Sequence, residues 1–540
     1  MQKRQIINIV NFVRGYDPRT SDDLAEPVRR QLALMEQHRL KGTFLLQYDA
    51  LINPDFTAPL LAADPDRIEV GVWFEIVQPL AEKAGIPWTG RYAWDWHARH
   101  AFSAGYRPEE RERMIDVLFE DFKAVFGFYP KSFGSWVFDA HTLAYASEKY
   151  GLDVACNCKD QWGTDGYTLW GGYYGQGYYP SRTNVFCPAK TKENQIHVPL
   201  LRMLGSDPVA QYDLGVAEHL ESSVSVQGVV TLEPVYCGDT GGGGVPAWTD
   251  WYLQQNFSGN CLTFGYAQAG QENSFGWPAM AAGLTDQFEK IAALQRSGRL
   301  TAETMGETGR WFKGAFASTP PSTIVAETDW KNTGRQSVWY NCGRYRINLY
   351  AEDGRFWIRD LYLFDDRYAE RYLDAVCDSD KITYDNLPVA DGSRFSGHGV
   401  RGGLYPSSDE KAAGGLPYAG MTYREASGAA EAIFSGTPCG DVTFTLREDG
   451  VHIAKTGAAP LYLTLCGDRT AADFPEISAE GEDTLRYIYR AHPYCVRFAG
   501  AAVLPHTDDA ESVLFRLCCS GETDMIFPEK DFGEKEEATK

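Results

Sequence analysis

Acidic residues stand at the carboxyl ends of short apolar segments in the first half of this 540-residue chain. Asp139, Glu75 and Glu233 each close such a segment, and Asp17 follows the first one. Two carboxyl groups on one cleft can hydrolyse a bond when one donates a proton and the other acts as nucleophile or as base for water. This chemistry requires that segments far apart in the sequence bring their ends to one face.

Strand and helix patterns alternate from the start of the chain to about residue 330. Segments such as 22–37 and 109–126 carry apolar residues at helical spacing. The alternation predicts parallel strands with crossover helices, closed into a (β/α)7–8 barrel over residues 1–330 whose carboxyl-end face holds the site. The predicted strands lie near residues 6–13, 43–48, 68–75, 132–138, 152–156, 196–203, 229–235 and 261–266.

The second part of the chain has shorter strand patterns and tight turns. Asp353-Gly354 and Asp449-Gly450 each separate two β-rich runs, which is a strong hairpin signal. Residues 336–527 are therefore predicted to form an antiparallel β-sandwich. The last residues, 528–540, read as a charged, flexible tail.

Charge and composition limit the classes of partner. The chain has 73 acidic and 51 basic residues, a net charge of −22, which repels nucleic acid and anionic membrane surfaces. No apolar run is long enough to cross a membrane, and the apolar start is too short for a signal sequence. The 12 cysteines lack paired metal-binding spacing, so we expect reduced thiols and a cytoplasmic location. The oligomeric state is left open.

Asp139 and Glu233 are the predicted catalytic pair, with Glu75 and Glu272 as reserves. The alternative for each is a strand-end carboxylate that caps the next helix or pairs with an arginine. For Asp139, capping and catalysis predict the same local sequence, so the two alternatives stay open.

Further side chains are predicted to bind a substrate. Arg14 and Asp17 would orient hydroxyl groups, and aromatic residues in two long loops, 85–105 and 163–180, would stack on the apolar faces of sugar rings. Such loops at a barrel mouth are often functional. The remaining candidates for substrate binding are Trp73, Asp95, Trp96, His97, His141 and Trp170.

Several of these segments resemble a known barrel. Thr43–Leu45, Glu69–Gly71 and the Asp after the first strand resemble the barrel shared by polysaccharide deacetylases and by glycoside hydrolases of the α-mannosidase and family-57 amylase type. Gly134 to Asp139 is similar to the fourth-strand nucleophile motif of the α-mannosidases. The resemblance to the family-57 enzymes implies Asp139 as nucleophile and Glu233 as acid.

The stretch from Gly71 through His97, followed by 134–141, also resembles an uncharacterised family of barrel-plus-sandwich proteins from gut bacteria. That resemblance covers nearly the whole chain. It implies the two-domain architecture and no activity.

The metal ligands of the resembled families are largely missing. Deacetylases use an Asp-Asp pair after the first strand and two histidines after the third, where this chain has Arg14 to Asp17 and Trp73 to Glu75. The preferred interpretation therefore needs no cofactor, although a divalent metal stays an open alternative. Its ligands would be Asp17, Asp139 and His141, with help from His97 and His100.

Three functions are consistent with these residues. A glycoside hydrolase acting on a carbohydrate substrate explains the strand-end carboxylates and the aromatic loops, and is preferred. A metal-dependent carbohydrate deacetylase would keep the fold with new ligands. A non-catalytic carbohydrate-binding protein would keep the aromatic residues without needing paired carboxylates.

Overall fold

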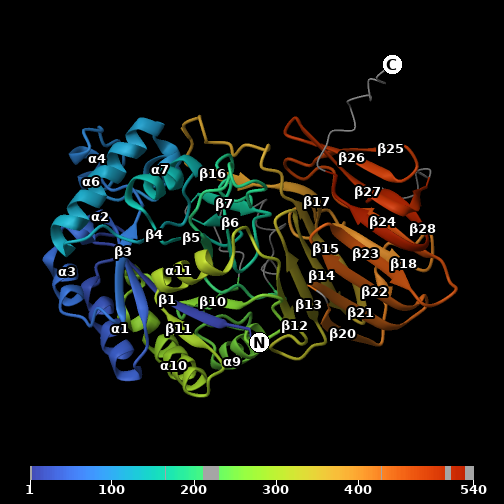
Figure 1. The fold of residues 1–540 in the computed structure, drawn as a ribbon, viewed down its shortest axis with the longest axis horizontal. Helices are drawn as coiled ribbons and strands as arrows, with labels where there is room; N and C mark the ends of the chain where they lie inside the picture. Colours follow the sequence, from blue (N-terminus) through green and yellow to red (C-terminus); the bar gives the residue numbers. More distant parts are fainter. Residues whose placement is uncertain (1–2, 165, 211–229, 427, 505–511, 529–540) are drawn as a thin grey trace. The chain divides into compact units, whose positions relative to one another are not determined.

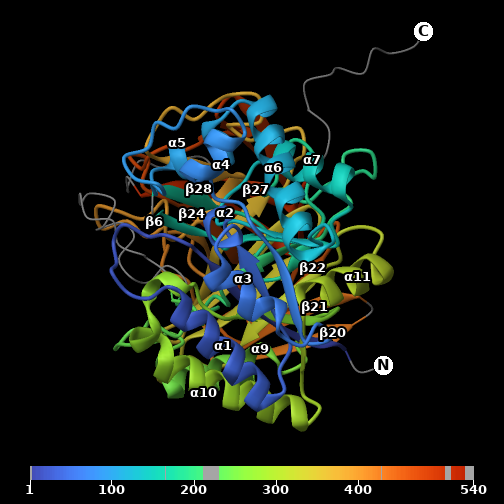
Figure 2. The same ribbon diagram turned by 90° about the vertical axis from the view of Figure 1, so that its left-hand side faces the viewer.

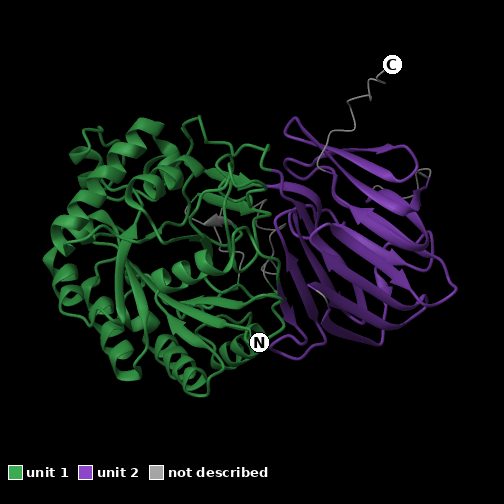
Figure 3. Ribbon diagram, viewed as in Figure 1, with its two compact units in different colours: residues 1–215, 222–322, 366–385 green, residues 216–221, 323–365, 386–540 purple. Residues whose placement is uncertain are grey.

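A computed structural model describes residues 3–164, 166–210, 230–426, 428–504 and 512–528. The chain divides into two compact units (Figure 3). Unit 1 comprises residues 1–215, 222–322 and 366–385, and unit 2 comprises residues 216–221, 323–365 and 386–540. The expectation that residues 1–330 and 336–527 are separate domains stays a prediction.

Unit 1 is built on a largely parallel sheet with strand order β10-β1-β2-β3-β4-β5-β9-β8, and β11 pairs with β1 (Figure 1). All nine residues of β1 are buried, as expected for a parallel strand covered on both faces. Beyond β9, the backbone N–H of Gly205 donates to the carbonyl of Gln268 in β10 at 3.3 Å, so the sheet is a nearly closed barrel. The strands are β1 (Gln5–Val13), β2 (Gly42–Leu46), β3 (Ile68–Trp73), β4 (Ser132–Gly134), β5 (Val154–Cys158), β8 (Gly177–Tyr178), β9 (Leu200–Met203), β10 (Gly265–Ala269) and β11 (Thr301–Glu303).

Helices follow the strands and cover the outside of this sheet. Figure 2 shows α1 and α10 beside each other on the outer surface of unit 1. The segments predicted as helices over 22–37 and 109–126 form α1 and α6. The helices are α1 (Ala25–His38), α2 (Tyr48–Leu51), α3 (Pro54–Leu61), α4 (Gln78–Lys83), α5 (Ala98–Ala101), η1 (Ser103–Gly105), α6 (Pro108–Phe126), α7 (Ala140–Tyr150), α9 (Pro246–Asn256), η2 (Asn273–Phe275), α10 (Trp277–Arg296) and α11 (Met305–Ala315).

Three predicted strands differ clearly from the structure. The strand expected over 261–266 begins only at Gly265, as β10. The strand expected over 132–138 ends at Gly134, where side chains from the neighbouring strands fill the place of a Cβ atom, which would lie 2.6 Å from the Leu45 side chain and 2.9 Å from the sulfur of Cys156. The segment expected as a strand over 229–235 forms an antiparallel bridge between Thr231 and Ser206 in its described part. Val229 lies outside the described residues. The backbone at Thr231 thus pairs with the turn after β9 instead of extending the parallel sheet.

A second, small sheet in unit 1 uses chain from the far end of the sequence. β6 (Gln161–Thr164) pairs antiparallel with β7 (Tyr167–Trp170), and β16 (Ile382–Asp385) pairs parallel with β7. The segment 366–385 therefore belongs to unit 1, although the residues before and after it in the sequence belong to unit 2.

Unit 2 consists of antiparallel strands. The two Asp-Gly hairpins are present as β14–β15 and β22–β23, with Asp353 and Gly354 at φ values of 51° and 67°. The prediction of a parallel α/β part followed by an antiparallel part is confirmed, and the packing of the second part as a sandwich stays a prediction. The strands are β12 (Ser322–Ala326), whose first residue lies in unit 1, β13 (Gln336–Asn341), β14 (Tyr345–Glu352), β15 (Arg355–Leu363), β17 (Leu387–Asp391), β18 (Gly403–Ser407), β19 (Leu416–Pro417), β20 (Gly420–Ala426), β21 (Ala429–Thr437), β22 (Gly440–Arg447), β23 (Gly450–Lys455), β24 (Leu461–Cys466), β25 (Glu476–Glu480), β26 (Thr484–Tyr489), β27 (His492–Val503) and β28 (Val513–Ile526).

Within the described ranges, no helix combines the length and the apolar character needed to span a membrane.

Candidate active site

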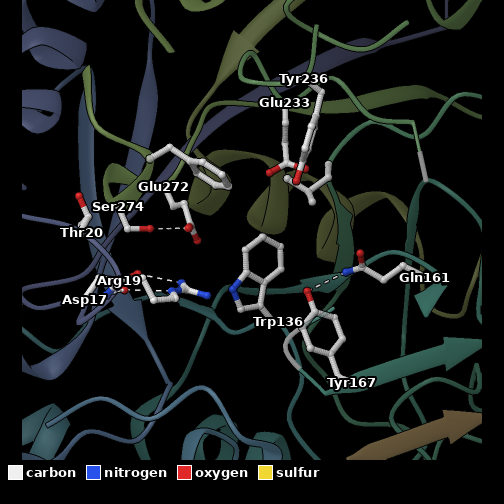
Figure 4. A pocket seen from close by; sticks show the side chains of 12 residues that line it. Asp17, Arg19, Thr20, Trp136, Gln161, Tyr167, Glu233, Tyr236, Glu272 and Ser274 are labelled. Carbon is white, nitrogen blue, oxygen red and sulfur yellow. Dashed lines mark hydrogen bonds and ion pairs between the residues drawn. The ribbon is translucent and has the colours of Figure 1, made fainter. Parts of the chain in front are cut away.

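A cavity of about 300 Å³ opens in unit 1 just beyond the carboxyl ends of the parallel strands (Figure 4). This is the position at which barrels of this kind place their active sites. Successive strand ends contribute Asp17 after β1, Trp136 after β4, Gln161 after β5, Leu204 after β9 and Glu272 after β10. The complete lining is Asp17, Arg19, Thr20, Trp136, Gln161, Tyr167, Leu204, Glu233, Tyr236, Glu272, Ser274 and Phe275.

Glu233 reaches the cavity from the segment that pairs with the turn after β9. Its Oε2 accepts a hydrogen bond from the Thr231 hydroxyl at 3.0 Å, and its Oε1 accepts one from the side-chain amide of Gln271 at 3.3 Å. The residue is 3% exposed, and both of these donors are neutral. The two bonds fix the carboxylate, while the antiparallel bridge at Thr231 fixes the backbone.

Glu272 reaches the same cavity from the segment after β10. Figure 4 shows the carboxylates of Glu233 and Glu272 directed toward the same space. The Oε1 atom of Glu272 accepts hydrogen bonds from Nη1 of Arg14, at 2.9 Å, and from the Ser274 hydroxyl. A cation therefore contacts Glu272 directly.

Arg14 is shared by several acidic side chains in a buried cluster. Its Nε and Nη2 donate to the two oxygens of Glu75 at 3.2 and 3.3 Å, and its guanidinium lies 4.1 Å from the Trp94 ring centre. Burial raises the pKa of Glu75 to about 6, although Arg14 opposes this rise, and the neighbouring Glu272 carboxylate adds to it. The Arg14 guanidinium thus bonds Glu75 and Glu272 directly, and its Nη1 also lies 3.9 Å from Oδ2 of Asp17.

Asp17 is held by the residue two positions later. The Arg19 guanidinium donates to both oxygens of Asp17, at 3.0 and 2.8 Å, and the Arg19 backbone N–H donates at 2.9 Å. Burial works to raise the pKa of Asp17, but hydrogen bonds from Arg19 and the charges of Arg14 and Arg19 lower it below its ordinary value. Asp17 is therefore a fixed anion on the cavity wall.

Aromatic rings form another part of the wall. The Trp136 ring is nearly parallel to that of Tyr167, with centres 6.2 Å apart, and packs edge-on against Phe12 at 4.8 Å. Trp73, a predicted binding residue, stacks on Phe12 at 4.3 Å and supports Trp136 from the barrel interior. The side-chain amide of Gln161 donates to the Tyr167 hydroxyl at 2.7 Å.

Asp139, the predicted partner of Glu233, is not among the residues that line the cavity. It is the N-cap of α7: its Oδ1 accepts from the backbone N–H of Thr142 at 2.9 Å and lies 3.0 Å from Nη1 of Arg111. Its Oδ2 accepts from the hydroxyls of Ser103, at 2.5 Å, and Thr142, at 2.7 Å. Because β4 ends at Gly134, Trp136 takes the strand-end place, and Asp139 begins the helix.

The expected convergence of five residues on one cavity is therefore met only in part. Asp17 and Glu233 line it, together with the reserve Glu272, whereas Glu75 does not line it and is linked to Glu272 through Arg14. His141 lies on α7 with its Nε2 3.0 Å from Glu112, so the structure does not bring it to the cavity.

The other predicted binding residues do not line the cavity. Asp95 is fully buried and bound by Arg91 at 2.9 and 2.8 Å and by the His97 backbone N–H at 3.2 Å, which makes it an organiser of its loop. The Arg19 guanidinium lies 5.4 Å from the Trp96 ring centre, which connects this loop to the cavity wall. Trp170 is a buried residue of β7.

Sequence reasoning did not select Trp136, Gln161, Tyr167 or Arg19 as site residues. Trp136 could have been found, because it stands two residues beyond the end of β4. Gln161 and Tyr167 depend on pairing with a strand more than 200 residues away, for which the local sequence carries no signal. Leu204 adopts a left-handed φ of 59° on the cavity wall, a backbone strain of the kind found at functional sites.

No group of three His, Cys, Asp or Glu side chains within the described ranges is arranged to hold a metal ion. The proposed ligands Asp17, Asp139 and His141 are held by Arg19, Arg111 and Glu112 respectively. The donor set among these residues therefore does not fit a resident metal.

Comparisons with known proteins agree with this architecture. Residues 103–319 match the model of a family described as "Domain of Unknown Function with solved-structure structure (DUF3863)". A solved structure from Parabacteroides distasonis, provisionally described as a glycoside hydrolase/deacetylase, matches with a TM-score of 0.53 at 15% identity, covering 72% of this chain and 90% of that chain. This chain shares its fold. The predicted resemblance to the glycoside hydrolase/deacetylase barrels is thereby confirmed at the level of fold.

Less similar structures include provisionally described polysaccharide deacetylases from Mycobacterium smegmatis and Pseudomonas aeruginosa PAO1. They match with TM-scores of 0.33 and 0.34, each at 13% identity over 58% of this chain and 92% of theirs. The comparison with curated proteins found no match.

Proposed function

We propose that this protein is a carbohydrate hydrolase that cleaves a glycosidic bond with Glu233 and Glu272. The observation that supports this most is that two buried carboxylates, from different strand-end segments, line one cavity together with aromatic rings. Glycosidic cleavage needs one carboxyl group that donates a proton to the leaving oxygen and one carboxylate that acts as nucleophile or base. Glu272 replaces Asp139 as the partner of Glu233 in this proposal.

Glu272 is the better candidate for the proton donor. It shares the Arg14 guanidinium with Glu75, and one positive charge cannot fully compensate two buried carboxylates. The pair therefore retains a proton to a higher pH than a single Arg–Glu pair would, and Glu272 is the member that lines the cavity. Glu233 would then be the nucleophile or base.

The remaining wall suits a sugar ring. Trp136, Tyr167 and Tyr236 offer apolar ring faces, and sugars present apolar C–H faces that pack on aromatic rings. Arg19 and Thr20 offer donors, and the fixed anion Asp17 offers acceptors for hydroxyl groups. The protein's net charge of −22 does not hinder the approach of a neutral sugar.

Glu75→Gln tests the role of Glu272. Without the Glu75 charge, Arg14 compensates one carboxylate fewer, so the pKa of the Glu272 carboxyl should fall. Because the proton donor would then lose its proton at lower pH, we expect the basic limb of the kcat/KM profile to move to lower pH and the activity at neutral pH to decrease. Kinetics between pH 4 and 9 measure this.

Glu69→Gln is the matched control, since Glu69 is a carboxylate near the opposite end of the same strand, bound by Ser132 at 2.6 Å and Thr43 at 3.0 Å. It should leave the profile unchanged. An unchanged basic limb in Glu75→Gln would assign the proton donor elsewhere.

A metal-dependent deacetylase is the second candidate, because the P. distasonis structure carries both descriptions. The two functions differ in product and in metal dependence. A chelator should leave the proposed glycosidase active on its substrate, whereas a deacetylase would lose activity and would release acetate instead of new reducing ends. A protein that only binds carbohydrate would show binding without either product.

A further inference from the structure

Lys159, directly after β5, is an unusual cation in the barrel. It is 2% exposed, and its Nζ has no hydrogen-bond partner among the described residues. A buried ammonium group without hydrogen bonds is unfavourable for stability. Its presence therefore suggests a role through its charge.

Cys158 pairs with Met203 of β9, and the backbone N–H of Leu232 donates to the carbonyl of Gly205 in the turn after β9 at 2.9 Å, so Lys159 and Glu233 both follow residues held at this end of β9. Lys159 interacts electrostatically with Cys158 and Asp160 beside it in the chain and with Glu233 and Asp207 from the segments that follow β9. Asp160 accepts a hydrogen bond from Arg202 at 2.8 Å, so it has another cation. Burial raises the pKa of the Cys158 thiol to about 12, which keeps it neutral. Glu233 and Asp207 are therefore the two carboxylates whose ionised forms the Lys159 charge can stabilise.

Glu233 and Asp207 differ in their hydrogen bonds. Asp207 accepts three, from the Trp248 indole and from the backbone N–H groups of Val209 and Ala210, each at 2.8 Å. Glu233 accepts longer bonds from the Gln271 amide, at 3.3 Å, and the Thr231 hydroxyl, at 3.0 Å. The ionised form of Asp207 is already stabilised by these bonds, and Glu233 is the carboxylate of the two that lines the cavity, so it is the one through which the Lys159 charge can affect catalysis.

Lys159 carries that charge at neutral pH. Burial lowers the pKa of Lys159 to about 8, and Cys158, Glu233, Asp160 and Asp207 oppose the decrease. The other charged or titratable side chains at this wall are Arg202, paired with Asp160, and Tyr167, which lines the cavity. Below about pH 8 the ammonium form therefore predominates beside Glu233.

We propose that Lys159 is a positioning residue that keeps Glu233 ionised, so that Glu233 serves as nucleophile or base while Glu272 donates the proton. The role of Glu233 rests on the proposed function. The electrostatic link between Lys159 and Glu233 does not, and it can be measured without turnover.

The link is tested by a double-mutant cycle on the full chain with Lys159→Met, Glu233→Gln and the combined variant. The melting temperature at pH 7 should fall several degrees further for Lys159→Met in the parent than in the Glu233→Gln background, because the second background has no anion to lose. The difference should shrink as the pH is lowered, because protonation of Glu233 removes the charge with which Lys159 interacts. If Lys159→Met lowered the melting temperature equally in both backgrounds, the proposal would be overturned. If the methionine variant does not fold, Lys159→Gln takes its place in the cycle.

The functional consequence is tested by the pH profile of kcat/KM. Lys159→Met should move the acidic limb up by about one pH unit, since Glu233 loses the charge that favours its ionised form. Lys159→Arg should restore the parent limb. Lys131→Met, which removes the same charge at the opposite end of the barrel where Lys131 bonds the carbonyl of Gly151 at 3.0 Å, should not move it.

The two tests separate the possible failures. An acidic limb that stays fixed in Lys159→Met, despite coupling in the cycle, would overturn the positioning role. Full activity in Glu233→Gln would instead refute the proposed function, while the cycle would still decide whether Lys159 and Glu233 interact.

Discussion

Replacing either Glu233 or Glu272 by glutamine is expected to lower kcat on a carbohydrate substrate by at least ~10²-fold. Glutamine keeps the size of the side chain and its ability to accept one hydrogen bond, but it can neither donate the acidic proton nor act as a base. The melting temperature of Glu233→Gln should fall by no more than the several degrees expected for the lost Lys159–Glu233 interaction, because Thr231 and Gln271 can still bond the new amide. Steady-state kinetics with thermal unfolding of the same preparations provide the measurement.

Glu303→Gln is a suitable control for these two variants. Glu303 is a buried carboxylate of β11 that pairs with Arg4 at 2.5 Å and does not line the cavity. It should retain the parent turnover per folded molecule. Full activity in both Glu233→Gln and Glu272→Gln would refute the assignment of this pair.

Asp139→Asn is expected to have the opposite effect, a large loss of stability with little loss of turnover per folded molecule. Asp139 and Arg111 are both fully buried and lie 3.0 Å apart, so the variant leaves the Arg111 charge without this carboxylate. Removing one partner of such a pair costs about 3–5 kcal/mol of unfolding free energy. Because asparagine can still cap α7, the loss of unfolding free energy would measure the contribution of the Asp139–Arg111 ion pair. Denaturant unfolding and activity corrected for the folded fraction measure both effects.

The matched control for Asp139→Asn is Asp116→Asn on α6. Asp116 is partly exposed and contacts Lys149 at 2.8 Å, so its substitution should cost less than about 1 kcal/mol. Turnover in folded Asp139→Asn that falls as far as in Glu233→Gln would contradict the structural role and return Asp139 to the catalytic candidates.

Periodicity and turn signals predicted the architecture well. The apolar segments became parallel strands because both of their faces are buried, and both Asp-Gly pairs connect hairpin strands. Asp353 and Gly354 adopt left-handed backbone angles, which these residue types do at low cost. Strand lengths were less predictable. The apolar residues after Gly134 continue the pattern of a strand, but the regular strand ends at Gly134, although the backbone N–H of Cys158 still donates to the carbonyl of Trp136 at 2.9 Å.

From the sequence, only those site residues could be predicted whose position follows from the end of a strand. Asp17, Glu233 and Glu272 line the cavity because they follow strands or the turn paired with β9. The choice between catalysis and capping for Asp139 depended on Arg111 and Ser103, whose packing against it has no local signal. The backbone N–H of Ala140, next to Asp139, is bonded by Glu370, 230 residues further along the chain, at 2.8 Å.

The most direct test of the catalytic pair is a crystal structure of Glu272→Gln with a bound oligosaccharide that the parent protein cleaves. We expect a sugar ring on Trp136, the scissile glycosidic oxygen within about 2.6–3.2 Å of the side chain at position 272, and the anomeric carbon facing Glu233. A sugar bound outside this cavity, or one that places an acetyl group instead of a glycosidic bond between Glu233 and position 272, would contradict the account.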